Sequence, residues 1–477
     1  MEALLFMIIG AVIWSIFTAS SDDSSNNKSP SLADSVSNTT ERHKKWSADN
    51  TRRRQRAQIT TPEIDMSDDF EDIINKLENT NNNFFITGRA GTGKSTVLQY
   101  FRATTNKSVV VLAPTGVAAL NVQGQTIHSF FKFGIDTTLD KVRSRDGYEN
   151  IEVLIIDEIS MVRSDLFDCV EKFLRLNGRK KGEPFGGVQI ILIGDLYQLP
   201  PVVKQEEESI FNSFYKSPYF FDAHSYEKGG FKTIELKHVY RQHDRGFVET
   251  LDSIRNAGIT DKQILKINKR VIDEEMVCTP ELAVKLVPTN NLADQINMME
   301  LEKIPEESYT FEANIMGEIK KRDFPTDTTL KLKRGAHIML LNNECDKKWV
   351  NGTLGKIVDI GRDIIKVQFQ DGTIHDVTPY EWEKIRFFYN KEESKIDTEV
   401  IGKFKQLPVR LAWAVTIHKS QGKTIDKVVV NMGNGAFASG QTYVALSRCR
   451  RIEDLFLVSP LDKKDVFVDD RICKFHV

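Results

Sequence analysis

The chain has 477 residues, of which 40% are hydrophobic and 28% are charged, and its formal net charge is −2. This length exceeds one ordinary hydrophobic core, so we expect about two to four domains. The near-neutral balance excludes binding to a polyanion through overall charge, so any nucleic-acid site must be a local patch. The five cysteines are scattered without a Cys/His cluster. The sequence therefore predicts no zinc site and no disulfide framework, but free thiols in a reducing compartment.

Residues 1–22 contain an uncharged, almost wholly apolar run, Ala3–Ala19. As a helix this run would span roughly 26 Å, slightly less than the ~30 Å hydrocarbon core of a bilayer. We expect a transmembrane signal-anchor helix that tethers cytoplasmic catalytic domains to a membrane. A cleaved signal peptide is disfavoured because Glu2 stands where a basic segment is usual. A packed hydrophobic tail or a mis-assigned start is the third interpretation.

Residues 23–61 are predicted to be a disordered linker. Ser, Asn and Asp dominate its first part, where large apolar residues are nearly absent. Its second part, Glu41–Gln58, carries seven Lys and Arg residues. Such a segment suits lipid head groups or nucleic-acid phosphates, and equally a solvated tether.

The pattern becomes globular from about Thr61. Short apolar runs alternate with helical stretches, which indicates a parallel sheet covered on both faces. These runs are Phe84–Thr87, Val109–Ala113, Val153–Ile156 and Gln189–Ile193. A second α/β pattern begins near Phe231 and is interrupted by a β-rich stretch, Arg334–Lys403. We expect this stretch to be a small antiparallel barrel inserted into the second unit.

Residues 88–95 read Gly-Arg-Ala-Gly-Thr-Gly-Lys-Ser, which matches the G-x-x-x-x-G-K-[ST] phosphate-binding pattern. Backbone N–H groups of such a loop wrap a triphosphate, Lys94 reaches the β- and γ-phosphates, and Ser95 binds Mg²⁺. A predicted strand precedes the loop and a predicted helix follows it, so the helix N-terminus favours an anion. The alternative interpretation is a plain Gly-rich turn.

Polar residues also follow two other apolar strands. Asp157 and Glu158 end the run Val153–Ile156. Because neighbouring side chains of a strand point to opposite sides, we expect Asp157 to hold Mg²⁺ and Glu158 to activate water. Gln198 follows the strand near Ile190 and is placed to contact a γ-phosphate; an ordinary solvated glutamine is the alternative.

Phosphoryl transfer also calls for positive charge. Arg241 and Arg448 lie far downstream in the second α/β unit. If they reach the nucleotide, it binds in a cleft between two domains that closes and opens during turnover. Taken singly, each arginine is more often a surface ion-pair partner, and the accompanying motifs reverse that expectation.

Eight segments of the chain resemble, in the same order, the motifs of Pif1-like helicases of superfamily 1B, and most of all their bacterial-type branch. They are Gly88–Thr96, Ala113–Asn121, Gly124–Phe131, Ile155–Val162, Gly194–Val202, Val239–Gln242, Ala414–Gly422 and Tyr443–Arg448. The resemblance covers roughly Pro62 to Val477. It implies two tandem RecA-like domains, residues 62–225 and residues 226–333 with 404–477. It further implies a wedge insertion at about residues 129–150 and an SH3-like barrel at 334–403.

The resemblance also implies ATP-driven 5′→3′ translocation on single-stranded DNA, with unwinding at single-strand/duplex junctions in DNA repair, recombination or replication. We expect a monomer. The implied nucleotide-binding residues are Gly88, Ala90, Gly91, Thr92, Gly93, Lys94, Ser95 and Thr96. Glu158 is implied as the catalytic base, with Asp157 on the metal. Gln198, Arg241 and Arg448 complete the γ-phosphate site.

For DNA, the resemblance implies contacts from both domains: Thr115, Gly116, His128, Ser129 and Phe130 from the first, and Thr416, His418 and Lys419 from the second. Small residues and hydroxyls permit close approach to a backbone, and the rings of His128 and Phe130 offer faces for bases. Simple core packing is the alternative for Phe130, and also for Phe131 and Phe133.

Two features depart from the family pattern. The glutamine that usually reads adenine upstream of the phosphate loop is missing from Met66–Asp69, so other nucleoside triphosphates are open as substrates. The apolar N-terminus is also unusual. An RNA-directed motor and a membrane-tethered, nucleotide-controlled scaffold therefore stay as alternative functions.

Overall fold

The computed structural model describes residues 68–134, 138–203, 205–242, 244–272, 283–344, 348–390, 395–433 and 435–475. These residues belong to one compact unit of the chain, Thr61–Val477. The prediction of a transmembrane helix is corrected, because no helix in these ranges is long and apolar enough to cross a membrane. Ala3–Ala19 itself, the single N-terminal helix expected there and the linker at 23–61 lie outside the described residues.

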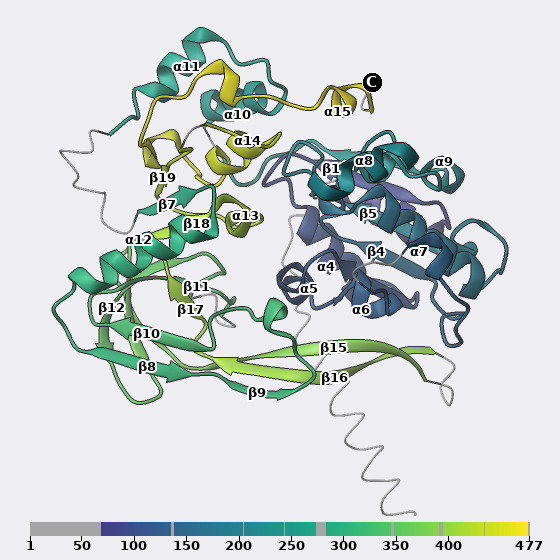
Figure 1. Ribbon diagram of the computed structural model, residues 1–477, viewed down its shortest axis with the longest axis horizontal. Helices are drawn as coiled ribbons and strands as arrows, with labels where there is room; N and C mark the ends of the chain where they lie inside the picture. Colours follow the sequence, from purple (N-terminus) through teal and green to yellow (C-terminus); the bar gives the residue numbers. More distant parts are fainter. Residues whose placement is uncertain are drawn as a thin grey trace, which may run out of the picture. The chain divides into compact units, whose positions relative to one another are not determined.

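The first domain contains a six-stranded parallel sheet in the order β3-β2-β4-β5-β1-β6 (Figure 1). Its strands are β1 (Phe84–Gly88), β2 (Val109–Ala113), β3 (Gln125–Thr126), β4 (Val153–Ile156), β5 (Gln189–Ile193) and β6 (Lys232–Leu236). Its helices are α3 (Asp68–Asn79), α4 (Lys94–Thr104), α5 (Gly116–Asn121), α6 (Ile127–Phe131), α7 (Ser164–Asn177), α8 (Gln205–Phe214) and α9 (Tyr226–Gly229).

Both faces of this sheet are buried. Phe84 and Ile86 pack with α3 and α4, whereas Phe85 packs with α7 on the other side. Successive side chains of a strand point to opposite faces, so burial on both sides produces continuous apolar runs. The predicted parallel sheet with two covered faces is confirmed.

The second domain has a four-stranded parallel sheet in the order β18-β7-β19-β20. Its strands are β7 (Val284–Val287), β18 (Ala414–Thr416), β19 (Val428–Val430) and β20 (Leu455–Leu457). Its helices are α10 (Arg245–Arg255), α11 (Asp261–Asn268), α12 (Asn290–Lys303), α13 (Ile417–Ser420) and α14 (Gln441–Leu446). Helices α10 and α14 share one hydrophobic cluster with this sheet. As predicted, the chain therefore contains two tandem RecA-like domains of the α/β class.

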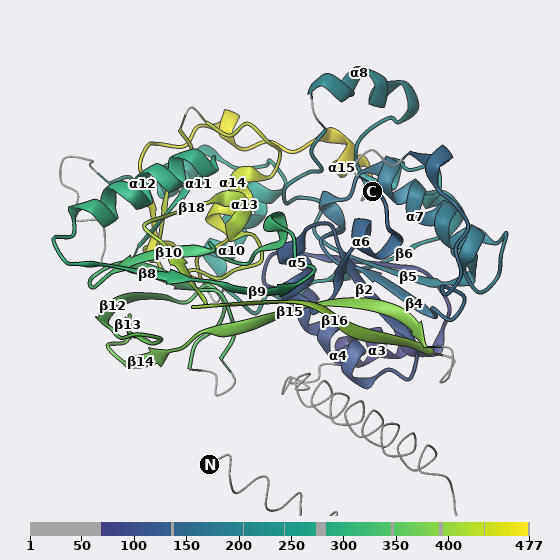
Figure 2. The same ribbon diagram turned by 60° about the horizontal axis from the view of Figure 1, so that its bottom comes forward.

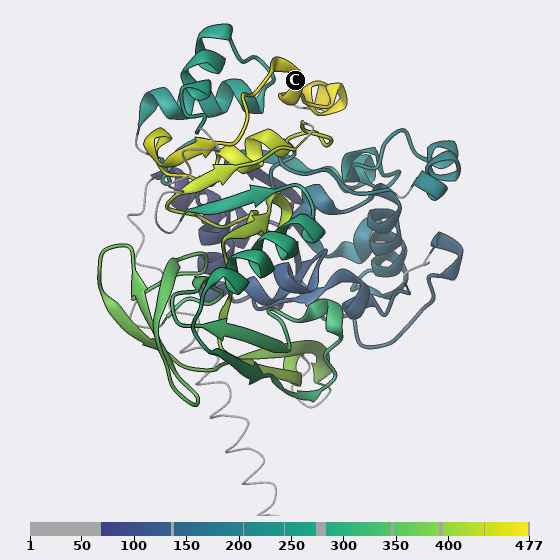
Figure 3. The same cartoon turned by 60° about the vertical axis from the view of Figure 1, so that its left-hand side comes forward.

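Between β7 and β18 the chain forms a β-rich region that lies to one side of the second sheet (Figure 3). Its strands are β8 (Ser308–Glu312), β9 (Asn314–Gly317), β10 (Thr329–Lys333), β11 (His337–Leu340), β12 (Leu354–Ile360), β13 (Ile365–Phe369), β14 (Ile374–Val377), β15 (Tyr380–Asn390), β16 (Lys395–Gln406) and β17 (Val409–Leu411). Five of them form an antiparallel sheet in the order β14-β13-β12-β11-β17. The region extends beyond the predicted limits, residues 334–403, on both sides.

Strands β15 and β16 form a long hairpin that runs from the β-rich region along the first domain (Figures 1 and 2). The backbone N–H of Phe387 donates to the Oε1 atom of Gln125, at 3.1 Å. The ring of Phe387 packs edge-on against Phe130, with 6.0 Å between ring centroids. The hairpin therefore connects the β-rich region to the first domain.

One predicted limit of the first domain differs from the structure. Strand β6 pairs with β1, so the first domain continues past residue 225. This edge strand is partly exposed along its length and carries no continuous apolar run, which is why the sequence pattern did not reveal it. Within the predicted wedge, residues 129–150, Val142 is buried and Tyr148 packs against Phe173 of α7. A duplex-separating role for this segment stays a prediction.

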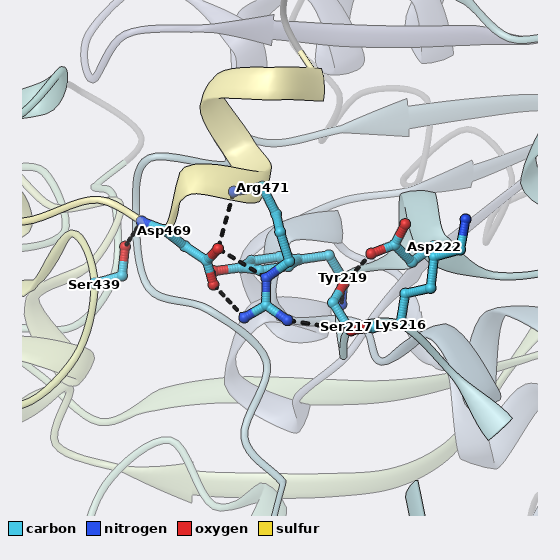
Figure 4. Close-up of polar contacts among 7 residues, drawn as sticks. All are labelled: Lys216, Ser217, Tyr219, Asp222, Ser439, Asp469 and Arg471. Atoms are coloured by element: carbon cyan, nitrogen blue, oxygen red, sulfur yellow. Dashed lines mark hydrogen bonds and ion pairs between the residues drawn. The ribbon is translucent and has the colours of Figure 1, made fainter. Parts of the chain in front are cut away.

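The C-terminal segment returns from the second domain to the first and ends in α15 (Asp470–Phe475). Phe475 stacks on Phe221, with 4.4 Å between ring centroids and 15° between ring planes. Figure 4 shows Arg471 paired with Asp469, and the Arg471 guanidinium lies 5.7 Å from the ring centroid of Tyr219. The Asp469 N–H donates to Ser439 Oγ in the second domain, at 3.2 Å. The segment thus joins the two domains.

Candidate nucleotide site and nucleic-acid residues

The phosphate loop lies between β1 and α4, as the sequence predicts. Gly91 and Gly93 have φ of 84° and 87°, a left-handed conformation that glycine adopts without strain. Lys94 donates from Nζ to the carbonyl oxygens of Gly88 at 2.7 Å and Arg89 at 2.9 Å. Desolvation lowers the pKa of Lys94, although nearby carboxylates oppose that shift. The loop therefore holds a partly desolvated ammonium group at the start of a helix.

Asp157 and Glu158 follow β4 directly, and Glu158 has φ 50° and ψ 44°. A non-glycine residue in this left-handed region is strained and often marks a functional site. This turn, rather than the strand alternation that we expected, sets the directions of the two side chains. Burial, followed by repulsion from Glu158, raises the pKa of Asp157. Burial also raises the pKa of Glu158, against the opposing charges of Lys94 and Arg448.

Gln198 is buried near the end of the loop that follows β5. Its Nε2 atom donates to the Oδ2 atom of Asp195 at 3.3 Å, and its backbone N–H donates to the Asp195 carbonyl at 3.0 Å. These contacts fix the side chain inside the site, so Gln198 is not the solvated loop residue of the alternative interpretation.

Arg241 and Arg448 come from the second domain and both face the phosphate loop region. A Cβ atom at Gly91 would lie 2.4 Å from that of Arg241, so this arginine rests against the loop. Arg448 is almost completely buried and donates to the carbonyls of Val444, Ser420 and Lys423. Burial, followed by repulsion from Arg241, lowers the pKa of Arg448 to about 9. Neither arginine is an isolated surface residue.

These groups line one cleft of about 1050 Å³ between the two domains. This volume is at the upper end of the range typical of ligand pockets, about 300–1,000 Å³. Its lining includes most of the predicted nucleotide residues and their partners: Ala90, Gly91, Thr92, Gly93, Lys94, Ser95, Thr96, Asp157, Glu158, Gln198, Arg241 and Arg448. The structure therefore brings together the residues that the sequence predicts for a triphosphate site.

Two predicted DNA residues occupy equivalent places in the two domains. Thr115 follows β2 and caps α5, accepting from the Ala118 N–H at 3.2 Å. Thr416 ends β18 and caps α13, accepting from the Lys419 N–H at 3.3 Å. A Cβ atom at Gly116 would lie 2.6 Å from an Asp323 carboxylate oxygen, so this glycine permits a close approach of the β-rich region.

The remaining predicted DNA residues differ in exposure. His418 and Lys419 are exposed on α13, and desolvation lowers the pKa of each. Ser129 accepts from Gln125 Nε2 at 2.9 Å, and His128 lies beside it, partly buried. Phe130 is buried among Phe131, Tyr148 and Phe387, so its ring is covered in this conformation. For Phe131 and Phe133 the packing alternative holds, because their rings stack within the first core at 5.3 Å.

The structure also shows two residues of the second domain that bond to residues of the cleft and that no sequence pattern had indicated individually. Gln421 donates from Nε2 to the Glu158 Oε2 atom at 3.0 Å. The phenol oxygen of Tyr443 accepts from the backbone N–H of Ala90 in the phosphate loop, at 2.9 Å. Gln421 and Tyr443 both lie within segments that resemble family motifs. Their place in those segments is the one sequence feature that could have indicated a role at the nucleotide site.

A phosphate loop, a buried acid pair and arginines from a second RecA-like domain define a two-domain P-loop nucleotide hydrolase. The family described as PIF1-like helicase matches residues 63–270. The ATP-dependent DNA helicase Pif1 of Bdellovibrio bacteriovorus is 32% identical over 429 residues, which cover 87% of this chain and 92% of that protein. The chain belongs to the PIF1-like helicase family.

Two solved structures extend this comparison. Bacteroides sp Pif1 in complex with ADP-AlF4 superposes with a TM-score of 0.80 at 32% identity, covering 87% of this chain and 97% of that one. Bacteroides Pif1 bound to ssDNA superposes with a TM-score of 0.62 at 33% identity, with the same coverage. The present conformation is therefore more similar to the first of these structures than to the second.

Proposed function

We propose that the protein is an ATP-dependent DNA helicase that translocates 5′→3′ along single-stranded DNA and separates duplexes at single-strand junctions. The hydrogen bond between Glu158 and Gln421 carries this proposal. It joins the proposed catalytic base in the first domain to the segment of the second domain that holds His418 and Lys419. Through this bond, a shift of Glu158 when the γ-phosphate is cleaved would move Gln421 and, with it, the neighbouring segment that we propose to bind DNA.

We propose the following roles in hydrolysis. Ser95 and Asp157 would hold Mg²⁺, which would offset phosphate charge; a cation suits a buried carboxylate repelled by its neighbour. The phosphates would compete with the carbonyls of Gly88 and Arg89 for the Lys94 ammonium. Glu158 orients the attacking water and accepts its proton, while Gln198 contacts the γ-phosphate.

Arg241 and Arg448 stabilise charge on the transferring group, and their approach requires the cleft to be closed. The two halves of the cleft come from one chain, which supports a monomer as the hydrolysing unit. We also propose a reducing, cytoplasmic location for these domains, supported by the free buried thiols of Cys169 and Cys449.

For DNA, we propose that Thr115, Gly116, His128, Ser129 and Phe130 in the first domain, with Thr416, His418 and Lys419 in the second, form the track. The caps of α5 and α13 place two threonine hydroxyls at the carboxyl ends of strands in the two sheets. Relative movement of these two positions, driven by closure of the cleft, would advance the strand.

Strand displacement with purified protein tests the proposal. We expect ATP-dependent separation of a DNA duplex with a 5′ single-stranded tail and little separation of one with a 3′ tail. RNA duplexes of the same sequences serve as the comparison for an RNA-directed motor. ATP hydrolysis that is not accompanied by separation of any tailed duplex would contradict the helicase proposal.

A further inference from the structure

A buried ion pair joins the two domains behind the nucleotide cleft. Arg255, the last residue of α10, places its guanidinium nitrogen 3.1 Å from Asp195 Oδ1, and the two side chains are 7% and 0% exposed. The same guanidinium lies 4.0 Å from the ring centroid of Tyr197. The pair is therefore enclosed by protein on the first-domain side.

The carboxylate of Asp195 also contacts the loop that carries Gln198. Oδ1 accepts from the Tyr197 N–H at 3.2 Å, and Oδ2 accepts from Gln198 Nε2 at 3.3 Å. One carboxylate thus connects a cation of the second domain to the amide that faces the γ-phosphate position. Gln198 reaches the cleft, whereas Arg255 does not line it.

The energetics argue against a purely stabilising role for this pair. Two desolvated charges often contribute less to stability than apolar side chains of similar size would. The bond geometry is also incomplete, because the Nε atom of Arg255 is buried without a hydrogen-bond partner among the described residues.

Helix α10 is packed in the same hydrophobic core as the helix that precedes Arg448. Phe247, Leu251 and Ile254 of α10 share a hydrophobic cluster with α14, the helix that precedes Arg448. A movement of the second domain that carries Arg448 toward the phosphates would therefore also change the position of Arg255 against Asp195.

We propose that Arg255 is a positioning residue that holds Asp195 and, through it, the side chain of Gln198, so that Gln198 is aligned on the γ-phosphate when the domains close. This inference rests on the proposed ATP hydrolysis but not on unwinding. Without Arg255, the Asp195 carboxylate would be held by its bonds to the Tyr197 N–H and to Gln198 Nε2, so its position and that of the Gln198 amide would be less constrained.

Three variants test the proposal: Arg255→Lys, Arg255→Met, and Arg255→Met combined with Asp195→Asn. We expect kcat for ATP hydrolysis to fall about 10- to 100-fold in Arg255→Lys while KM changes less than about threefold, since small misplacements of a catalytic group have costs of this size. Binding of ADP with aluminium fluoride should weaken by a similar factor, and binding of ADP alone should not.

The double variant separates positioning from stability. Arg255→Met alone leaves a buried, unpaired carboxylate and is expected to unfold more readily, whereas the double variant removes both charges and should regain thermal stability. We expect kcat to stay low in the double variant. Recovery of kcat together with stability, or wild-type kcat in Arg255→Lys, would overturn the proposal.

Arg270→Lys is the matched control. The Arg270 guanidinium also lies over an aromatic ring, 4.8 Å from the centroid of Phe456, but it donates to the Leu455 carbonyl within the second domain and does not line the cleft. The kcat of this variant should remain within about threefold of wild type. A wild-type protein that hydrolyses ATP without unwinding DNA would contradict the helicase proposal and leave this test intact, so the two failures are distinguishable.

Discussion

The two domains meet in two chemically different ways. Beside the nucleotide, the contacts are polar and buried: Gln421 with Glu158, Tyr443 with Ala90, and Arg255 with Asp195. At the C-terminal segment, the contact is mainly apolar, because Ile472 is fully buried in the first core and Phe475 stacks on Phe221. Directional bonds specify one arrangement of charges, whereas apolar burial is non-directional.

This difference suggests a division of labour. The polar contacts lie at the phosphate loop and the acid pair, so changing them should alter the rate of hydrolysis. The residues of the apolar contact do not line the cleft, so changing them should mainly alter the free energy of unfolding. A variant at a polar contact should therefore change hydrolysis, and a variant at the apolar contact should change stability.

Lys94→Ala should give the largest effect on catalysis. Removing the ammonium deletes the charge that reaches the phosphates, and loss of one such electrostatic contact typically costs about 10²- to 10³-fold in kcat. Phosphate release measures this effect, and the thermal unfolding midpoint should stay close to that of the wild type. Retained turnover would refute the role proposed for Lys94.

Ile472→Ala should show the opposite pattern. Truncating a fully buried isoleucine costs about 2–5 kcal/mol of unfolding free energy. Urea denaturation measures the loss, while kcat for ATP should remain within about twofold. If kcat instead fell tenfold at a temperature where the variant is folded, the C-terminal contact would belong with the catalytic ones.

Tyr443→Phe tests the polar contacts beside the nucleotide, and its expected effect on catalysis is smaller than that of Lys94→Ala. The substitution leaves the Ala90 N–H buried without its acceptor, which costs about 1–3 kcal/mol. Because this bond exists between the domains, we expect kcat/KM for ATP to fall about 5- to 20-fold. Tyr215→Phe is the control, since its phenol bonds to Asp168 within the first domain and away from the cleft; equal losses in both variants would remove the distinction.

The sequence predicted those parts of the site that depend on local patterns. The phosphate loop between β1 and α4 and the acid pair after β4 each follow a short apolar run, and each lies where expected. The parallel sheet followed from the same runs. Glu158 differs in detail, because its left-handed backbone depends on the surrounding structure and not on strand alternation.

Contacts between distant residues could not be predicted in this way. Arg255 and Asp195 are sixty positions apart, and Phe387 and Gln125 are separated by 262 positions. Neither pair lies in a pattern with a helical or strand period, so no local signal connects its members. Edge strand β6 was missed for a related reason, since an exposed edge needs no apolar run.

The contact between the β15–β16 hairpin and the first domain is a third connection between regions. It does not fit the distinction between polar contacts that serve hydrolysis and apolar contacts that serve stability. Phe387 covers Phe130, which we propose to contact DNA, and its backbone bonds to Gln125, which in turn donates to Ser129. Bacteroides Pif1 bound to ssDNA also superposes less well than the ADP-AlF4 complex. An apolar contact here would oppose DNA binding as long as it persists.

Phe387→Ala should therefore increase the affinity for single-stranded DNA. An aromatic pair contributes about 0.5–1.5 kcal/mol beyond its buried area, which corresponds to an increase of roughly two- to tenfold if the contact must break before DNA binds. Fluorescence anisotropy with a labelled oligonucleotide measures the change. Phe388→Ala, the exposed neighbour on the same strand, should leave the affinity unchanged. Weaker binding by Phe387→Ala would contradict this prediction and would mean that the hairpin supports the DNA site.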